Sequence, residues 1–132
     1  MSSKKSIIII IAMRLTSVMA MISCTHKPQI TPVSFSKDII PVFTAGCTIN
    51  SSCHLGANGL NQDVDLDSAE AWNTIISKGL VSVADPSASL LYVEVNSNGT
   101  GFADMPKPPA AALPASQQAL ILEWIQQGAK DN

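Results

Sequence analysis

The residues best suited to chemistry lie in the stretch CTINSSCHLGANGL, residues 47 to 60. Cys53 is followed directly by His54, and five residues separate Cys53 from the upstream Cys47. Covalent attachment of a c-type haem uses the signature C-x-x-C-H, so the second half of that signature is intact and the first half is longer. TINSS is polar and free of proline, so it can form the bulge that brings both sulfurs to one porphyrin. The pattern is compatible with thioether attachment, with His54 as an iron ligand.

A second iron ligand is available in the segment DMPKPP, where Met105 lies between Asp104 and Pro106. Histidine paired with methionine is a ligand set of electron-transfer haems, and the methionine raises the reduction potential. The other four methionines of the chain all lie within its first 23 residues. A lone methionine can simply fill a gap in a core, but its polar, proline-rich surroundings favour the ligand role for Met105.

The same residues allow two other sites. A disulfide between Cys47 and Cys53 would staple the loop of a haem-free protein, since free thiols rarely persist outside the cytoplasm. A zinc ion would use Cys47, Cys53 and His54, but it would need a fourth ligand, and adjacent Cys and His side chains fit one tetrahedral site poorly. From the cysteines alone, the disulfide and the haem are equally compatible with the sequence.

Two further groups of polar residues are expected to be solvated. Asp63, Asp65 and Asp67 alternate as in a calcium-binding loop, but the glycine and the bidentate glutamate that such a loop needs are missing from the later positions. His26, the other histidine, lies close to the predicted lipid anchor described next. Neither group is predicted to bind a metal.

The first 23 residues have the composition of a secretory signal. Lys4 and Lys5 precede an unbroken apolar run over residues 7–13, which is too short for a membrane span, and small residues follow. Ile22-Ser23-Cys24 resembles a bacterial lipobox, in which the new N-terminal cysteine is lipidated. We therefore predict a lipoprotein signal peptide over residues 1–23 and lipidation of Cys24. A start at Met13 would explain the arginine at position 14.

Beyond the signal, we predict a tether over residues 24–33 and one domain over residues 34–132. The tether is polar and contains two prolines. Loss of the first 23 residues removes three of the eight basic residues and none of the ten acidic ones, so the formal charge becomes −5. This negative charge argues against nucleic acid as a partner, since binding to it needs basic patches, and it favours protein partners with a basic face.

Apolar periodicity and capping residues predict four helices, over residues 34–46, 67–79, 85–95 and 116–128. The residues expected to cap their starts are Ser34 or Ser36, Asp67 or Ser68, Asp85 before Pro86, and Ser116. Pro41 lies where it would kink or restart the first helix. The side chains expected to face inward are Phe35, Ile39, Ile40, Val42, Phe43, Trp72, Ile75, Ile76, Leu90, Leu91, Val95, Leu120, Ile121, Trp124 and Ile125.

The connecting segments are long for so short a chain. Residues 54–67 are rich in Gly, Asn and Asp and predict an ordered loop, with Leu60, Val64 and Leu66 as core contacts. No segment has the pattern of a strand, so the predicted fold class is mostly α. Short helices joined by long loops bury little apolar surface, and a planar apolar cofactor of haem size would fill the middle of such a domain.

The order of the sequence blocks resembles the small cytochrome c domains of bacterial surface lipoproteins. The blocks SFSKDIIPVFTAGC, Cys53-His54, ADPSASLLYVEV, DMPKPP and ALILEWIQQGA cover roughly residues 35 to 129. In that family an aromatic-x-x-[DN]-I-x-P-[IV]-F segment leads into the haem-binding cysteines and a Met-Pro supplies the distal ligand. A C-terminal I-x-x-W-I-x-x-G-A helix packs against the opening helix. Members with widened cysteine spacings occur, and the wide spacing is where this chain departs from the usual pattern.

The resemblance implies a cytochrome c-like helical domain whose long loops wrap around one covalent haem c. Cys47 and Cys53 would be the thioether cysteines, His54 the proximal ligand and Met105 the distal ligand. With both axial positions occupied, no position is left for a substrate. The expected function is therefore electron transfer by iron cycling between Fe(II) and Fe(III), and not enzymatic catalysis, although the domain could be the redox partner of an enzyme.

These predictions together describe a monohaem electron carrier anchored by a lipid in the bacterial cell envelope, on a periplasmic or outer-membrane face. Its partners would be redox proteins and the membrane that holds the lipid. The alternative is a haem-free lipoprotein that serves as an interaction module and is stapled by a Cys47–Cys53 disulfide.

Overall fold

The computed structural model describes residues 30–58, 61–96, 105–108 and 110–132. The predicted signal peptide, Cys24, His26 and the predicted core contact Leu60 lie outside the described residues. Residues Thr31–Asn132 form one compact unit, and its described residues contain helices and loops but no strand, which confirms the mostly α fold class. None of the helices in these described ranges has the length and apolar character needed to span a membrane.

The first helical segment consists of a π-helical turn, η1 (Phe35–Ile39), that continues into α2 (Ile40–Gly46). Ser34 caps it as predicted, because its Oγ accepts a hydrogen bond from the Lys37 N–H while its own N–H donates to Asp38 Oδ2. Pro41 lies in the first turn of α2, where its missing N–H costs no intrahelical bond. The restart at Pro41 agrees with the prediction from the sequence, whereas the π-helical form of the first turn was not predicted.

The second helix, α3 (Ala71–Ser77), is shorter than predicted. Asp67 caps a preceding turn instead of the helix itself, with its Oδ1 accepting from the Ala69 N–H. Gly79 ends the segment as predicted, in the left-handed region with φ of 64°. The prediction that Ile76 faces inward is wrong, because Ala71 and Ile75 occupy the buried face one turn apart and leave Ile76 exposed.

A 3-10 turn, η3 (Pro86–Ala88), precedes α4 (Leu90–Val95). Asp85 caps η3 through a hydrogen bond from the Ala88 N–H. The chain is extended at the buried Ser89, so η3 and α4 do not form one continuous helix. This break rotates Leu90 into solvent, and the prediction that Leu90 faces inward is wrong, whereas Leu91 and Val95 are buried as expected.

The last helix is α5 (Ala115–Gln126). Ser116 was predicted to cap it, and this is wrong: the helix begins one residue earlier, after Pro114, whose carbonyl accepts from the N–H groups of Gln117 and Gln118. The fixed φ of proline sets the entry into the helix here without a side-chain cap. Gly128 ends the helix region as predicted, with φ of 101°.

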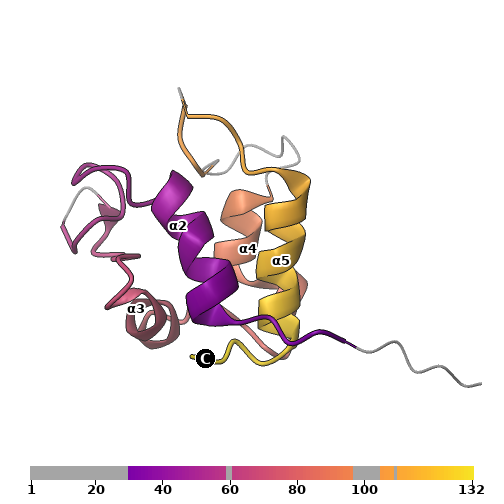
Figure 1. Cartoon of the computed structure of the whole chain (residues 1–132). Coiled ribbons are helices and arrows are strands. Elements are labelled where there is room, and N and C mark those ends of the chain that lie inside the picture. Colours follow the sequence, from indigo (N-terminus) through magenta and orange to yellow (C-terminus); the bar gives the residue numbers. More distant parts are fainter. Residues whose placement is uncertain (1–29, 59–60, 97–104, 109) are drawn as a thin grey trace, which may run out of the picture. The chain divides into compact units, whose positions relative to one another are not determined.

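The hydrophobic core is built around Trp124. Its ring lies 5.1 Å from that of Phe35, which in turn meets Phe43 edge to face at 6.3 Å. The resemblance implies that the last helix packs against the opening one, and α5 does pack against η1, as well as against η3 and α4, while α3 is set apart from this group (Figure 1). These rings, with the other buried apolar side chains, give the described part of the domain a hydrophobic core of its own.

The C-terminal tail ties the separate segments together. The two tryptophans donate to its carbonyls, Trp72 to Ala129 at 2.9 Å and Trp124 to Lys130 at 2.9 Å. Asn132 accepts from the Phe35 N–H at 2.8 Å. Val33, which the sequence assigns to the tether, is buried and donates its N–H to the side chain of Gln127, directly after α5. These bonds tie α3 and the opening helix to the C-terminal tail.

Candidate functional site

The first cysteine of the predicted attachment motif lies at the C-terminal end of α2. Cys47 is 9% exposed, and its N–H donates to the Phe43 carbonyl at 2.7 Å. The Thr48 N–H donates to the same carbonyl at 3.0 Å. Because Phe43 is itself in the core, this helix end gives Cys47 a fixed and buried position.

The five residues between the two cysteines form a loop that returns to the point where it begins. The loop is closed by a hydrogen bond from the His54 N–H to the Cys47 carbonyl at 2.9 Å. Inside it, Asn50 accepts twice, through its carbonyl from the Cys53 N–H and through Oδ1 from the Ser52 N–H. The bulge that the wide spacing requires is therefore a closed loop, and it carries Cys53 and His54 back to Cys47.

The two cysteines are free thiols in different environments. Burial raises the pKa of the Cys47 thiol from 9.0 to about 11, and the neighbouring Cys53 contributes in the same direction. Cys53 is only partly buried. Since the thiolate is the reactive form, Cys47 is the less reactive nucleophile in the folded, haem-free chain.

We expect Cys47 in the folded, haem-free chain to be alkylated by iodoacetamide far more slowly than in the unfolded chain. A pKa near 11 in place of 9.0 leaves about a hundredfold less thiolate at neutral pH. The raised pKa also makes the free energy of unfolding depend on pH. The contribution of the protonated Cys47 thiol is fully present below pH 9.0 and is lost as the pH rises towards 11. Mass spectrometry of the Cys47 peptide after timed labelling, with and without denaturant, measures the ratio. Equal rates in the two states would contradict the buried position of Cys47.

His54 is held by hydrogen bonds on three of its polar atoms. Besides its N–H bond to Cys47, its carbonyl accepts from the Leu66 N–H at 2.8 Å, and its ring Nδ1 lies 2.8 Å from the Val64 carbonyl oxygen. A carbonyl can only accept, so Nδ1 must carry the proton in this bond. The neutral ring then has its lone pair on Nε2, which is the arrangement of histidines that bind metal ions.

The loop after His54 contributes residues that the sequence analysis did not assign to the site. Val64 was predicted as a core contact, and it is partly buried against the core, but its carbonyl also orients the His54 ring. Asn61 is buried and donates to the Cys53 carbonyl. Asp65, expected to be solvated, is partly buried and accepts from the Gly56 N–H. The polar composition of residues 56–67 was the signal in the sequence that could have identified them. The backbone N–H and C=O groups of an ordered loop need hydrogen-bond partners, and polar side chains in the loop supply them.

The Met-Pro loop reaches the same end of the domain. The Met105 N–H donates to the Glu94 carbonyl of α4 at 2.9 Å, and the Met105 side chain is partly buried against the core. A Cβ atom at Gly46, the last residue of α2, would lie 3.7 Å from Pro106 Cγ. The loop therefore rests on the helix end that carries Cys47.

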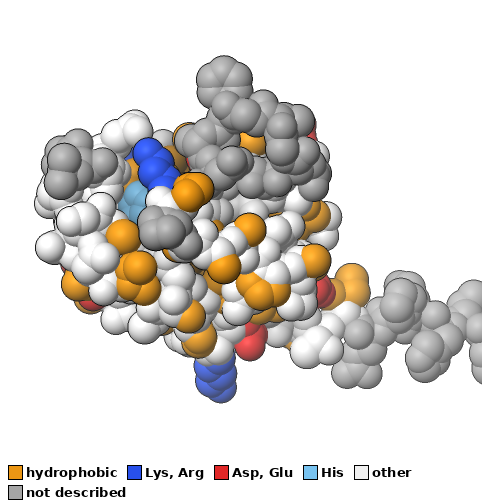
Figure 2. Space-filling view, turned by 90° about the horizontal axis from the view of Figure 1, so that it is seen from above, with side chains coloured by type: hydrophobic (Ala, Val, Ile, Leu, Met, Phe, Trp, Pro, Cys, Tyr) orange, Lys and Arg blue, Asp and Glu red, His pale blue; other side chains and the backbone are white. Residues whose placement is uncertain are grey.

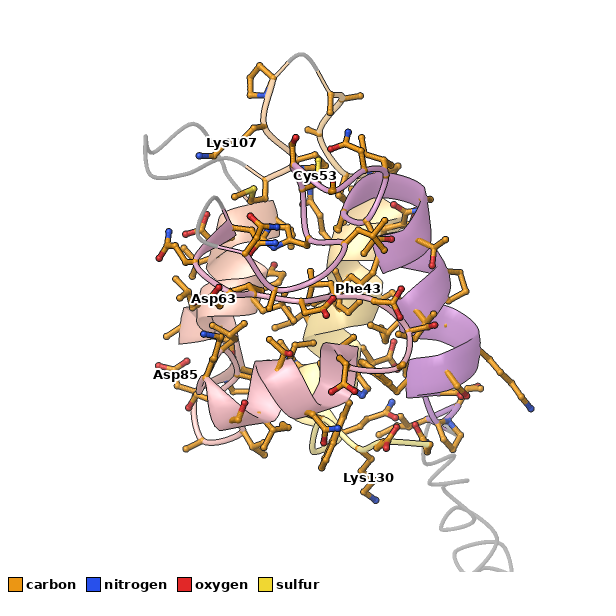
Figure 3. All side chains as sticks on the ribbon, turned by 90° about the vertical axis from the view of Figure 1, so that its left-hand side faces the viewer. Phe43, Cys53, Asp63, Asp85, Lys107 and Lys130 are labelled. Atoms are coloured by element: carbon orange, nitrogen blue, oxygen red, sulfur yellow. The ribbon has the colours of Figure 1, made fainter. Side chains whose placement is uncertain are left out.

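The pictures place the site at one end of the compact unit. In Figure 3, Cys53 and Lys107 lie at the same end, and Lys130 lies at the opposite end. Figure 2 looks onto this end and shows a histidine beside a basic side chain, with hydrophobic side chains around them. Ile49, in the loop between the two cysteines, and Leu55, directly after His54, are both exposed.

The described residues include Cys47, Cys53, His54 and the three aspartates whose spacing was compared with zinc and calcium sites. Among them, no group of three or more His, Cys, Asp or Glu side chains is arranged to hold a metal ion. Asp63 is exposed, and Asp65 uses its carboxylate to accept from the N–H groups of Gly56 and Asp67. An iron ligated by one histidine and one methionine needs no such group, so this finding leaves the haem prediction untouched.

The fold and the site together define a small, mostly helical domain that carries a Cys-x5-Cys-His loop and a Met-Pro loop at one end. No protein-family model, curated protein or solved structure matches the chain. The functional assignment therefore depends on the residues of the site.

Proposed function

We propose that this chain is a small c-type cytochrome that carries electrons. Cys47 and Cys53 would hold one haem c through thioethers, and His54 and Met105 would be the two axial ligands. The observation that supports the proposal best is the bonding of His54. Its Nδ1 proton is committed to the Val64 carbonyl, so Nε2 is the ring nitrogen left to bind a metal.

The donor set fits this cofactor. Two thiols, an imidazole and a thioether are the groups that a covalently attached, low-spin haem requires. Pro106, next to Met105, lies near Gly46 at the end of α2, the residue before Cys47, and the closed loop brings Cys53 and His54 back to Cys47. When bound, the haem supplies one-electron chemistry by cycling between Fe(II) and Fe(III).

The chain's own residues would bind, orient and shield the cofactor. Since His54 and Met105 would occupy both axial positions, no coordination position would remain for a substrate, which favours an electron carrier over an enzyme. The partly buried His54 and the exposed Leu55 beside it leave the site close to the surface, where a redox protein partner can approach. Lipidation of Cys24 would tether the domain in the bacterial cell envelope.

The test is production of the mature chain together with cytochrome c maturation factors. We expect a coloured protein with a sharp Soret band, and haem that stays with the polypeptide during denaturing electrophoresis. The matched control is Cys53→Ser, which removes the thiol next to His54 and should lose most of the covalent haem. A colourless wild-type protein with a Cys47–Cys53 disulfide in its mass spectrum would instead support the haem-free interaction module.

A further inference from the structure

Two polar side chains are buried in the described part of the chain, and they serve different purposes. Ser89 is explained by the fold, because its hydroxyl accepts from the Ser82 N–H at 2.8 Å and joins the segment before η3 to the start of α4. Asn61 is 8% exposed, and every side-chain bond that it makes goes to the loop around His54. A buried amide costs free energy unless its donors and acceptor are paired. Asn61 meets that condition only in this loop conformation.

The amide of Asn61 uses all of its polar atoms. Its Nδ2 donates to the Cys53 carbonyl at 2.7 Å and to the Gly56 carbonyl at 2.8 Å. Its Oδ1 accepts from the Asn58 N–H at 3.1 Å. One side chain therefore holds the backbone on both sides of His54, one residue before it and two residues after it.

The peptide that joins Cys53 to His54 is held at both of its polar atoms. Asn61 binds its carbonyl oxygen, and the Cys47 carbonyl accepts from its N–H at 2.9 Å. Because a peptide is planar, fixing both atoms fixes the plane. The other side of His54 is held by the bond from the Leu66 N–H to the His54 carbonyl, so the two bonded peptides together orient the side chain whose Nδ1 reaches the Val64 carbonyl.

We propose that Asn61 is the positioning residue for His54. It holds the Cys53–His54 peptide so that Nδ1–H stays on the Val64 carbonyl and Nε2 stays available for metal binding. The iron-related part of this inference rests on the proposed function. The orientation of the ring belongs to the chain itself, so it can be tested without haem.

The first test uses ¹⁵N NMR to measure the ratio of the two neutral tautomers of His54 in the haem-free mature chain, at a pH where the imidazole is neutral. The wild-type ring should be almost entirely in the Nδ1–H form. In Asn61→Ala, the Nδ1–H···Val64 bond should be lost for much of the time, and the population of the Nε2–H form should rise several-fold. An unchanged tautomer ratio in a folded Asn61→Ala chain would overturn the proposal.

Two more variants show whether a changed tautomer ratio comes from lost positioning of His54 or from a general loss of stability. Asn61→Ser is the milder change, since a serine hydroxyl is too short to make the amide's bonds, and it should shift the tautomer ratio in the same direction even if Asn61→Ala does not fold. Ser89→Ala removes the other buried polar group, so thermal stability should fall while the tautomer ratio of His54 stays that of the wild type. An equal shift in Ser89→Ala would show that any loss of stability has the effect, and Asn61 would have no special role.

The haem-loaded protein gives an independent readout. A hydrogen bond from Nδ1–H to a carbonyl makes a histidine a stronger electron donor to its metal and so stabilises Fe(III). In Asn61→Ala, the ratio of Fe(II) to Fe(III) at a fixed applied potential should therefore rise several-fold, with a changed electron paramagnetic resonance signal for the ferric form. An unchanged ratio and signal would overturn the proposal. If the wild-type chain takes up no haem, the proposed function fails, while the tautomer measurement still decides the role of Asn61.

Discussion

In the proposed cytochrome, replacing Met105 with alanine is expected to leave the haem attached and to open one coordination position on its iron. The proposed thioethers and His54 are untouched by this change, and the backbone bond from residue 105 to the Glu94 carbonyl does not depend on the side chain. Carbon monoxide should bind to the reduced variant, and the oxidised variant should become partly high-spin. The reduction potential should fall by on the order of 0.1 V or more, because a methionine ligand raises it and axial ligands set it over a wide range.

Absorption spectra with and without carbon monoxide, together with a potentiometric titration, measure this effect. The matched control is Leu120→Ala on α5, because Leu120 is also a partly buried apolar side chain packed against the core. That control should lose a similar amount of packing without binding carbon monoxide. If Met105→Ala keeps the wild-type spectrum and potential, Met105 is not a ligand, and the proposal of a His/Met electron carrier fails.

The helices could be predicted from the sequence wherever a local signal determines them. Two caps and two helix-ending glycines have their expected roles, because each depends only on its own backbone conformation or on the adjacent turn. They are Ser34, Asp85, Gly79 and Gly128. The errors arise where tertiary context decides. Leu90 is exposed because the buried Ser89 bonds to Ser82 and breaks the helical register, and no periodicity within residues 85–95 contains that information.

The candidate site is likewise divided between residues that could be predicted from the sequence and contacts that depend on tertiary structure. Its chemistry-bearing residues, Cys47, Cys53, His54 and Met105, could be named from residue type and spacing. The groups that orient them could not, because the Val64 carbonyl and the Asn61 amide reach His54 and Cys53 only after the chain reverses between residues 56 and 64. A backbone carbonyl carries no signal of its own in a sequence, and asparagine is common in solvated loops as well as in ordered ones.

Replacing Trp124 with alanine is expected to have the largest effect on stability. The ring is 1% exposed, lies against Phe35 and donates to the Lys130 carbonyl. Deleting a buried aromatic side chain costs about 3–5 kcal/mol, and its hydrogen bond adds about 1 kcal/mol. A domain of this size has a free energy of unfolding of about 5–15 kcal/mol. Its melting temperature should therefore fall by roughly 15–30 °C, as measured by circular dichroism of the haem-free chain.

Two conservative changes show whether the ring or its hydrogen bond matters more. Trp124→Phe keeps an aromatic ring against Phe35 and loses the bond to Lys130, and it should cost about 1–2 kcal/mol. Trp72→Phe loses the equivalent bond to Ala129 from a partly buried position and should cost about 1 kcal/mol. If Trp72→Phe destabilises the chain as much as Trp124→Ala, the core is not centred on the contact between α5 and η1.

Trp124 and Trp72 bond to the tail, whereas the candidate site residues gather at the end of α2. In haem-loaded Trp124→Phe, the melting temperature should therefore fall while the absorption spectrum stays that of the wild type.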